Sequence, residues 1–319
     1  NFEFGFLNFP FVIFLFAFST LAPFALIAPA YALPARLAGD ASVPNPTLIT
    51  FDDQAELIGY ALPQKAVAPG GELRITIYWR AKTRIAEDFS VYIRLLDAAG
   101  NIVGRWEAFP GGGLYPTRLW QPGEIIVDEY RVPVSLDARG PDVGRVEVGL
   151  FRRVPLENLT ARDPQGRAIT PTIARFKIAG QSQVQVEGAQ APTNFGDQIA
   201  LVGYTRPRTI VAGSTLTVKL YWRALASITE DYTVFVHVLD ANGNTVAQKD
   251  DQPQRGAYPT SFWDVGETVA DEYAVALPSD LAPGDYQIET GIYRASNGAR
   301  LSIRNGGDAL GLGTIRVTR

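Results

Sequence analysis

The side chains best suited to ligand contact are aromatic residues that recur in two similar loops. The stretch YPTRLWQPGE, which contains Tyr115 and Trp120, returns as YPTSFWDVGE, which contains Tyr258 and Trp263. Exposed aromatic rings can form a sugar-binding platform, whereas buried rings pack the corner of a β-domain. Because both stretches keep the same residues, a packing corner is the preferred interpretation. A ligand or partner surface is the alternative.

The similarity extends beyond these loops to two longer copies within the chain. Residues that the two copies do not share are better candidates for specialised contacts. Trp106 is one, since the corresponding position later in the chain is Lys249. We therefore include Trp106 in the possible ligand or partner surface. A second candidate is the insert from Val154 to Pro171, which lengthens one loop.

Paired acidic residues could in principle serve a glycosidase. The pairs are Glu87 with Asp88, Asp128 with Glu129, Glu230 with Asp231, and Asp271 with Glu272. Neighbours on one strand point to opposite faces, so they cannot face each other across a cleft as glycosidase carboxylates do. We expect these acids to be solvated at loops and strand edges.

The remaining polar motifs are also weak evidence for a reaction centre. His237 is the only histidine, which is too few for a typical zinc site, and we expect it on the surface. The stretches that begin at Asp97 and Asp240, DAAGN and DANGN, fit hairpin turns better than calcium loops, which need more oxygen ligands. We assign no catalytic, metal or cofactor-binding residue.

Composition narrows the class of protein further. The chain has 319 residues, a formal net charge of −4 and no cysteine. The net negative charge disfavours nucleic acid as a partner. The lack of cysteine excludes disulfides, thiolate metal sites and a cysteine nucleophile.

The elements that must position these residues are duplicated. FDDQAELIGY from Phe51 matches FGDQIALVGY from Phe195, and LRITIYWRA from Leu73 matches LTVKLYWRA from Leu216. This spacing predicts two domain-sized copies, repeat 1 (residues 51–180) and repeat 2 (residues 195–319). The polar segment 181–194 between them has the composition of a linker.

Each copy has the pattern of β-strands. Apolar and polar residues alternate from Leu73 to Trp79, which places one face in a core. Turn sequences follow at short intervals, and no amphipathic helix of ten residues is evident in either copy. The fold class expected is all-β, with tandem antiparallel β-sandwiches of immunoglobulin-like or jelly-roll-like type.

The N-terminal segment is different in character. Residues 1–35 are almost free of charge and long enough for a transmembrane anchor helix, and residues 36–50 resemble a stalk. A signal peptide is the alternative, but no Lys or Arg precedes the apolar run. The helix would contact lipid, integral membrane protein subunits or bulky apolar pigments. Its candidate contact residues are Phe9, Phe11, Phe14, Phe16, Phe18 and Phe24.

The motifs APFALIAPAYALP, YWRA and YPTRLW, in this order, carry a resemblance. The chain resembles the C-terminal extracytoplasmic region of bacterial multi-span membrane glycosyltransferases of the dolichyl-phosphate-mannose-protein mannosyltransferase-like kind. The resemblance implies a last membrane helix that leads into β-sandwich modules outside the cytoplasm. It carries over no catalytic residue.

Two functions remain open at this point. The first is a non-catalytic accessory or scaffold subunit of a larger membrane complex, anchored in the cell membrane with its β-domains on the periplasmic or cell-surface side. The second is a carbohydrate- or cell-wall-binding part of a membrane glycosyltransferase, with glycans as ligands.

Overall fold

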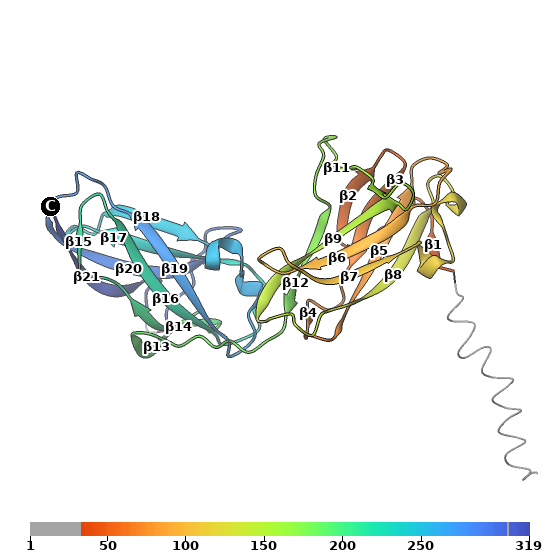
Figure 1. The fold of residues 1–319 in the computed structure, drawn as a ribbon. Helices are drawn as coiled ribbons and strands as arrows, with labels where there is room; N and C mark the ends of the chain where they lie inside the picture. Colours follow the sequence, from red (N-terminus) through yellow and green to blue (C-terminus); the bar gives the residue numbers. More distant parts are fainter. Residues whose placement is uncertain (1–32, 305) are drawn as a thin grey trace, which may run out of the picture.

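The computed structural model describes residues 33–304 and 306–319 (Figure 1). Most of the expected anchor, including its six candidate phenylalanines, lies outside the described residues. Among the residues that are described, no helix combines the length and the apolar character needed to cross a bilayer.

Repeat 1 is built from two sheets. The first contains, in spatial order, β1 (Ala35–Leu37), β8 (Ile125–Pro133), β5 (Glu72–Ala81), β3 (Ala55–Ala61), β2 (Pro46–Phe51) and β11 (Ala161–Arg162). The second contains β4 (Ala66–Val67), β12 (Thr172–Ile178), β9 (Asp142–Arg152), β6 (Ser90–Leu96) and β7 (Ile102–Ala108), with β10 (Glu157–Asn158) paired to β9. The insert from Val154 to Pro171 thus supplies one short strand to each sheet.

Repeat 2 follows the same plan with fewer strands. Its first sheet contains β13 (Ala189–Phe195), β14 (Ile199–Thr205), β16 (Thr215–Ala224) and β19 (Thr268–Ala276). Its second contains β15 (Thr209–Val211), β21 (Leu310–Thr318), β20 (Gly284–Arg294), β17 (Tyr232–Leu239) and β18 (Thr245–Asp251). In both repeats, one hydrophobic core joins residues from the two sheets, so the expected all-β, sandwich-like arrangement is confirmed.

The strand alternation places a tryptophan at the centre of each core. Trp79 of β5 and Trp222 of β16 are both fully buried. The ring of Trp79 lies 5.8 Å from that of Phe51, and the ring of Trp222 lies 5.6 Å from that of Phe195. Burial of such large rings makes a major contribution to the stability of a sandwich that has no disulfide.

Three details differ from the sequence-based expectation. The expected stalk, residues 36–50, is not a free spacer, because β1 pairs with β8 and β2 pairs with β3. The expected linker, residues 181–194, ends in β13. The sheets are also not wholly antiparallel, since β4 pairs parallel to β12 and β15 pairs parallel to β21. Polar, small-residue segments can join a sheet edge through backbone hydrogen bonds alone, and hydrophobic periodicity does not report such pairing.

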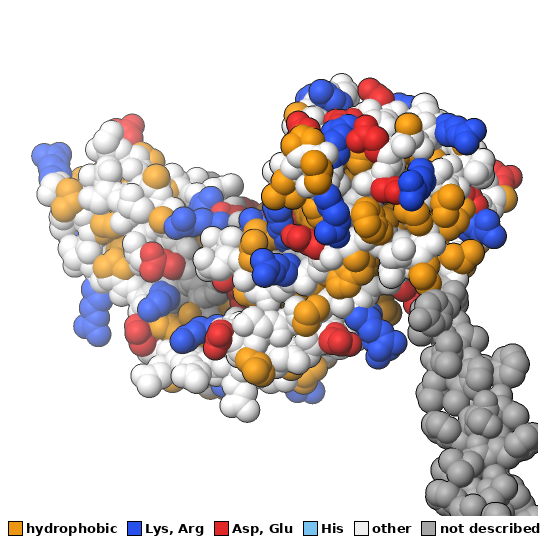
Figure 2. Space-filling view, turned by 45° about the vertical axis from the view of Figure 1, so that its right-hand side comes forward, with side chains coloured by type: hydrophobic (Ala, Val, Ile, Leu, Met, Phe, Trp, Pro, Cys, Tyr) orange, Lys and Arg blue, Asp and Glu red, His pale blue; other side chains and the backbone are white. Residues whose placement is uncertain are grey.

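The two repeats lie end to end, with β12 of repeat 1 next to the loops that precede β19 (Figure 1). On the face shown in Figure 2, basic and acidic side chains of the described residues are interspersed, without a large patch of one sign. This distribution agrees with the small net charge of the chain.

A glycine in each second sheet makes room for an aromatic ring on the strand beside it. A Cβ at Gly291 would overlap the ring of Phe235 and would lie 2.6 Å from the backbone oxygen of Asp308. Phe235 is only 1 % exposed, and its ring is packed between His237 and Arg300. The same relation holds between Gly149 and Tyr92 in repeat 1.

We therefore expect Gly291→Ala to lower the free energy of unfolding by about 1–3 kcal/mol, the usual cost of forcing extra atoms into a packed site. Chemical denaturation of the purified chain would measure the change. Gly311→Ala is the control, because a Cβ there meets no atom within 4 Å. Equal stability of the two variants would contradict the packing role.

Candidate binding groove at the repeat joint

The aromatic residues of the two similar loops form the corners in which the chain crosses from one sheet to the other. In repeat 1 this corner contains η2 (Gly111–Gly113) and η3 (Thr117–Leu119), and in repeat 2 it contains η4 (Pro253–Gly256) and η5 (Thr260–Phe262). Each corner thus connects the last strand of one sheet to a strand of the other sheet.

Within each corner, the tryptophan binds back to the tyrosine. The indole nitrogen of Trp120 donates to the backbone oxygen of Tyr115 at 3.1 Å, and Trp263 donates to Tyr258 at the same distance. Both tryptophans are almost completely buried, and both tyrosines are 6 % exposed. None of these four rings offers an exposed platform to a ligand.

A carboxylate closes each corner. The hydroxyl of Tyr115 donates to Glu124 at 3.1 Å, and the hydroxyl of Tyr258 donates to Glu267 at 2.6 Å. Burial and the bond to Glu267 raise the pKa of Tyr258, so its hydroxyl stays protonated and remains a donor. We call each of these Tyr–Glu pairs a corner socket.

Trp106 is placed differently from the corner residues. It is partly buried and packs against the core of repeat 1, with its ring 4.6 Å from the ring of Tyr130 in an edge-to-face arrangement. Its position on β7, the edge strand of its sheet, leaves part of the ring accessible.

Two of the acidic pairs are not solvated as expected, and that expectation was wrong for one member of each pair. Asp128 is 2 % exposed and Asp271 is 5 % exposed. Asp128 accepts hydrogen bonds from Tyr130 and from the backbone nitrogen of Gly111, so it ties β8 to the corner. Burial raises the pKa of both carboxyl groups.

The expectation for His237 was also wrong. This side chain is 9 % exposed, stacks on Phe235 with 4.5 Å between the ring centres, and lies near the carboxylates of Asp250 and Glu289. Two acidic neighbours and an aromatic ring on the same sheet face account for its position without a catalytic role.

The expected hairpin turns are confirmed. Gly100 and Gly243 have φ values of 90° and 82°, and the carboxylates of Asp97 and Asp240 accept hydrogen bonds within their own turns. Within residues 33–304 and 306–319, no group of three His, Asp or Glu side chains is placed to hold a metal ion.

The most unusual side chain lies at the joint between the repeats. Lys177 of β12 has a side chain that is only 3 % exposed. Its Nζ donates to the backbone oxygen of Phe262 at 2.8 Å, to Asp264 at 2.7 Å and to Glu267 at 2.6 Å. Three acceptors satisfy the three donors of a lysine ammonium, which makes burial of the charge possible.

Other contacts reinforce the joint around Lys177. The guanidinium of Arg175 donates to the backbone oxygens of Gly256 and Ala257 at 3.0 and 2.7 Å. Val143 of repeat 1 is 4 % exposed and packs into the hydrophobic core of repeat 2. The joint therefore combines a buried ion pair with apolar packing.

The two corner sockets receive cations in the same way but at different depths. Lys177 lies 5.5 Å from the centre of the Tyr258 ring and binds Glu267. Arg36, just before repeat 1, lies 5.8 Å from the ring of Tyr115 and 3.5 Å from Glu124, but its side chain is 52 % exposed. Each socket thus takes a basic side chain from the segment that precedes its repeat.

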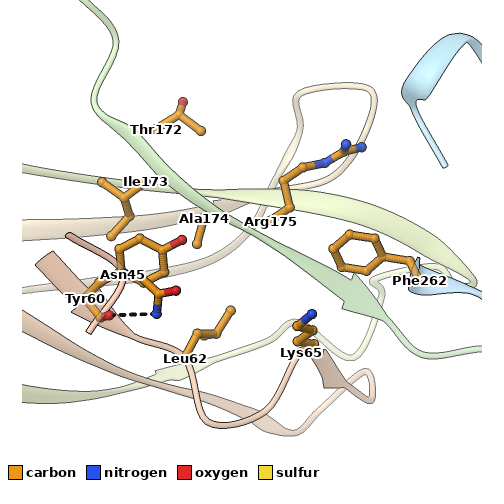
Figure 3. Close-up of a pocket in the computed structure, with 9 residues that line it drawn as sticks. All are labelled: Asn45, Tyr60, Leu62, Lys65, Thr172, Ile173, Ala174, Arg175 and Phe262. Carbon is orange, nitrogen blue, oxygen red and sulfur yellow. Dashed lines mark hydrogen bonds between the residues drawn. The ribbon is translucent and has the colours of Figure 1, made fainter. Parts of the chain in front are cut away.

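The joint forms one side of a groove of about 420 Å³ (Figure 3). Its lining comes mostly from repeat 1, with Phe262 added by repeat 2. The lining residues are Asn45, Tyr60, Leu62, Lys65, Thr172, Ile173, Ala174, Arg175 and Phe262. The side-chain nitrogen of Asn45 donates to the backbone oxygen of Tyr60 at 3.0 Å, which fixes the loop before β2 against β3.

None of the aromatic residues proposed from the sequence lines this groove. Phe262 directly precedes Trp263 in the corner motif, and Tyr60 ends the repeated LIGY stretch, so both lay within noted motifs. The residue of repeat 1 that corresponds to Phe262 is Leu119. This difference between the two corners was the sequence feature that could have indicated Phe262 as a candidate.

Comparisons with known proteins identify no family. No family model and no curated protein matches the chain. Among solved structures, the C-terminal domain of Wzt is similar over 41 % of this chain and 81 % of that one, with 13 % identity and a TM-score of 0.31. A CARDB domain from Pyrococcus furiosus, determined with two metal ions, is similar over 44 % of this chain and all of that one, with 11 % identity and a TM-score of 0.25. A family 2 glycosyl hydrolase from Bacteroides cellulosilyticus is similar over 77 % of this chain but 29 % of that one, with 10 % identity and a TM-score of 0.25. Scores this low support no conclusion about function.

The buried carboxyl groups predict a pH effect. A raised pKa means that the carboxyl group of Asp128 holds its proton more tightly in the folded chain than in the unfolded chain, where its pKa is near 3.8. The contribution of Asp128 to stability is therefore full below that value and declines as the pH rises through the raised pKa. Asp128→Asn removes the ionisation and keeps an oxygen for Tyr130 and Gly111.

We expect the free energy of unfolding of Asp128→Asn, relative to the parent chain, to rise from pH 3 to pH 7 by about 1.4 kcal/mol per unit of raised pKa. Urea denaturation at several pH values would measure it. Glu272→Gln, a change of an exposed acid, is the control. A relative stability that falls with pH would contradict the assignment.

Proposed function

We propose that the chain is a non-catalytic accessory subunit that holds a rigid pair of β-sandwiches outside a membrane. In this proposal, residues 1–35 form the anchor, and the sandwiches are of immunoglobulin-like or jelly-roll-like type. The subunit serves as a scaffold within a larger membrane complex and contacts other integral subunits through the anchor.

The observation that carries the proposal is the joint at Lys177. Domains joined by a short linker usually move relative to one another unless their interface is extensive. A buried ion pair adds little net stability, but its strict geometric needs favour one arrangement of its partners. A joint of this kind suits a protein in which the spacing and direction of two surfaces matter, which is what a scaffold requires.

Lys177→Met tests the rigidity directly. The substitution leaves Glu267 buried without its cation, so we expect the repeats to separate or to adopt several orientations. The chain has no cysteine, so Glu107→Cys and Asp280→Cys provide two unique exposed sites for spin labels. The distance distribution between the labels should be narrow in the parent chain and clearly broader in the variant.

Arg36→Met is the matched control for that experiment. It removes the cation from the other corner socket, which lies away from the joint. The distance distribution should stay narrow. A narrow distribution in Lys177→Met as well would mean that the ion pair does not fix the joint.

The subunit assignment has its own test. We expect the full chain to remain in the membrane fraction after a high-salt wash, and to purify in mild detergent at a fixed ratio to integral membrane proteins. A version that starts at residue 33 should lose both properties. Purification of the full chain without a partner would refute the assignment.

A second candidate function is carbohydrate binding, as the C-terminal part of a membrane glycosyltransferase. The groove beside the joint favours it, since Tyr60 and Phe262 are partly exposed there and lie next to amide, hydroxyl and basic groups. Aromatic rings with a few polar groups are typical of sites for polar ligands that have apolar faces.

A further inference from the structure

The two basic residues of the groove have no acidic partner among the described residues. Among the described residues, no carboxylate oxygen lies within 4.0 Å of the side-chain nitrogens of Lys65 or Arg175. Lys177, on the same strand as Arg175, has two acidic partners. An excess of positive charge in one groove stands out in a chain whose net charge is −4.

The position of Arg175 keeps its charge available. One terminal nitrogen is used by the backbone oxygens of Gly256 and Ala257, and the guanidinium lies 5.7 Å from the ring centre of Phe262. The residue as a whole is exposed. A guanidinium held in this way still offers donors in a fixed orientation to a carboxylate or a phosphate.

The groove has two chemically different ends (Figure 3). Tyr60 and Leu62 provide an apolar surface at one end, while Lys65 and Arg175 lie nearer to Phe262 at the other. A ligand that fits both ends has an apolar face on one unit and a negative charge on the next. A volume of about 420 Å³ is in the range of sites for small ligands.

We propose that this groove binds an acidic oligosaccharide, with its carboxylate or phosphate between Lys65 and Arg175 and a sugar ring against Tyr60. The proposal rests on the second candidate function, carbohydrate binding, and adds the charge of the ligand and the place where it binds. It is independent of the scaffold function.

Repeat 2 supplies a matched control position. The backbone nitrogen of Lys177 donates to the backbone oxygen of Lys65. In the corresponding parallel strand pair of repeat 2, the backbone nitrogen of Arg316 donates to the backbone oxygen of Arg208. Arg208 is thus the counterpart of Lys65 on the other sandwich. A charge reversal at Arg208 changes the net charge of the chain by the same amount as one at Lys65, without touching the groove.

The test is calorimetric titration of the full chain and its variants with three probes. These are a trigalacturonate, its neutral methyl ester, and a phosphodiester-linked glycan oligomer of similar length. We expect the parent chain to bind at least one acidic probe about tenfold or more tightly than the neutral ester, and the affinity to fall as salt is added. The tighter acidic probe identifies carboxylate or phosphate as the natural group.

The variants then locate the site. Lys65→Glu should weaken binding of the acidic probe about tenfold or more, and Tyr60→Ala should weaken it as well. Arg208→Glu should leave it within about twofold. Lys65 is exposed, so its substitution should not unfold the chain, and a thermal melt of each variant would verify this.

Three results would overturn the inference, and they differ in what else they remove. Equal binding of the neutral ester would refute the acidic ligand but leave carbohydrate binding in place. Binding that Lys65→Glu does not change would move the site away from this groove. The absence of binding to all three probes would remove both the inference and the second candidate function.

Discussion

Burial of the Lys177 ammonium is the constraint on which the arrangement of this protein depends. A charge in a site only 3 % exposed is tolerable only when all its donors are used, and here the acceptors come from the other repeat. This requirement brings β12 against the corner that precedes β19. The same approach carries Phe262 to the edge of repeat 1 and so forms the groove. The contacts of Lys177 therefore link the way the repeats meet to the shape of the groove.

The corner motif makes two kinds of contact, one within its repeat and one with the preceding segment of the chain, and its sequence alone does not distinguish them. Within each repeat, the tryptophan and tyrosine close the crossing between sheets through the bond from Trp120 or Trp263 to the tyrosine backbone. Between segments, the glutamate at the end of the motif receives a basic side chain from the preceding part of the chain. Both copies of the motif make both kinds of contact. They differ in how deeply the basic side chain is buried.

The sequence predicted what depends on local pattern and on internal repetition. The alternation from Leu73 to Trp79 predicted β5 and its buried tryptophan, and the shared corner residues favoured packing over ligand contact. The joint could not be predicted in this way. Lys177 lies on a strand face that alternation marks as outward, and only the three-dimensional arrangement shows that another domain covers that face. Burial of Asp128 was missed for a different reason. It shares a strand face with the buried Tyr130 and Val132, but its acidic side chain was expected to be solvated, and its partner Gly111 comes from a separate loop.

The register of the last strand in each repeat gives the tandem arrangement a direction. Arg316 of β21 corresponds to Lys177 of β12, because both residues pair in the same register with the short parallel strand beside them. On the other side, Arg316 pairs with Asp285 and Lys177 pairs with Val143. In repeat 2 the acid at that cross-strand position binds the arginine at 3.1 Å, and both side chains remain more than half exposed. In repeat 1 the valine leaves the cation free to enter the next domain and itself packs there. The cation near the end of repeat 1 thus joins it to the next domain, whereas the corresponding cation of repeat 2 is neutralised within its own sheet, and the two differ in the residue opposite them, Val143 or Asp285.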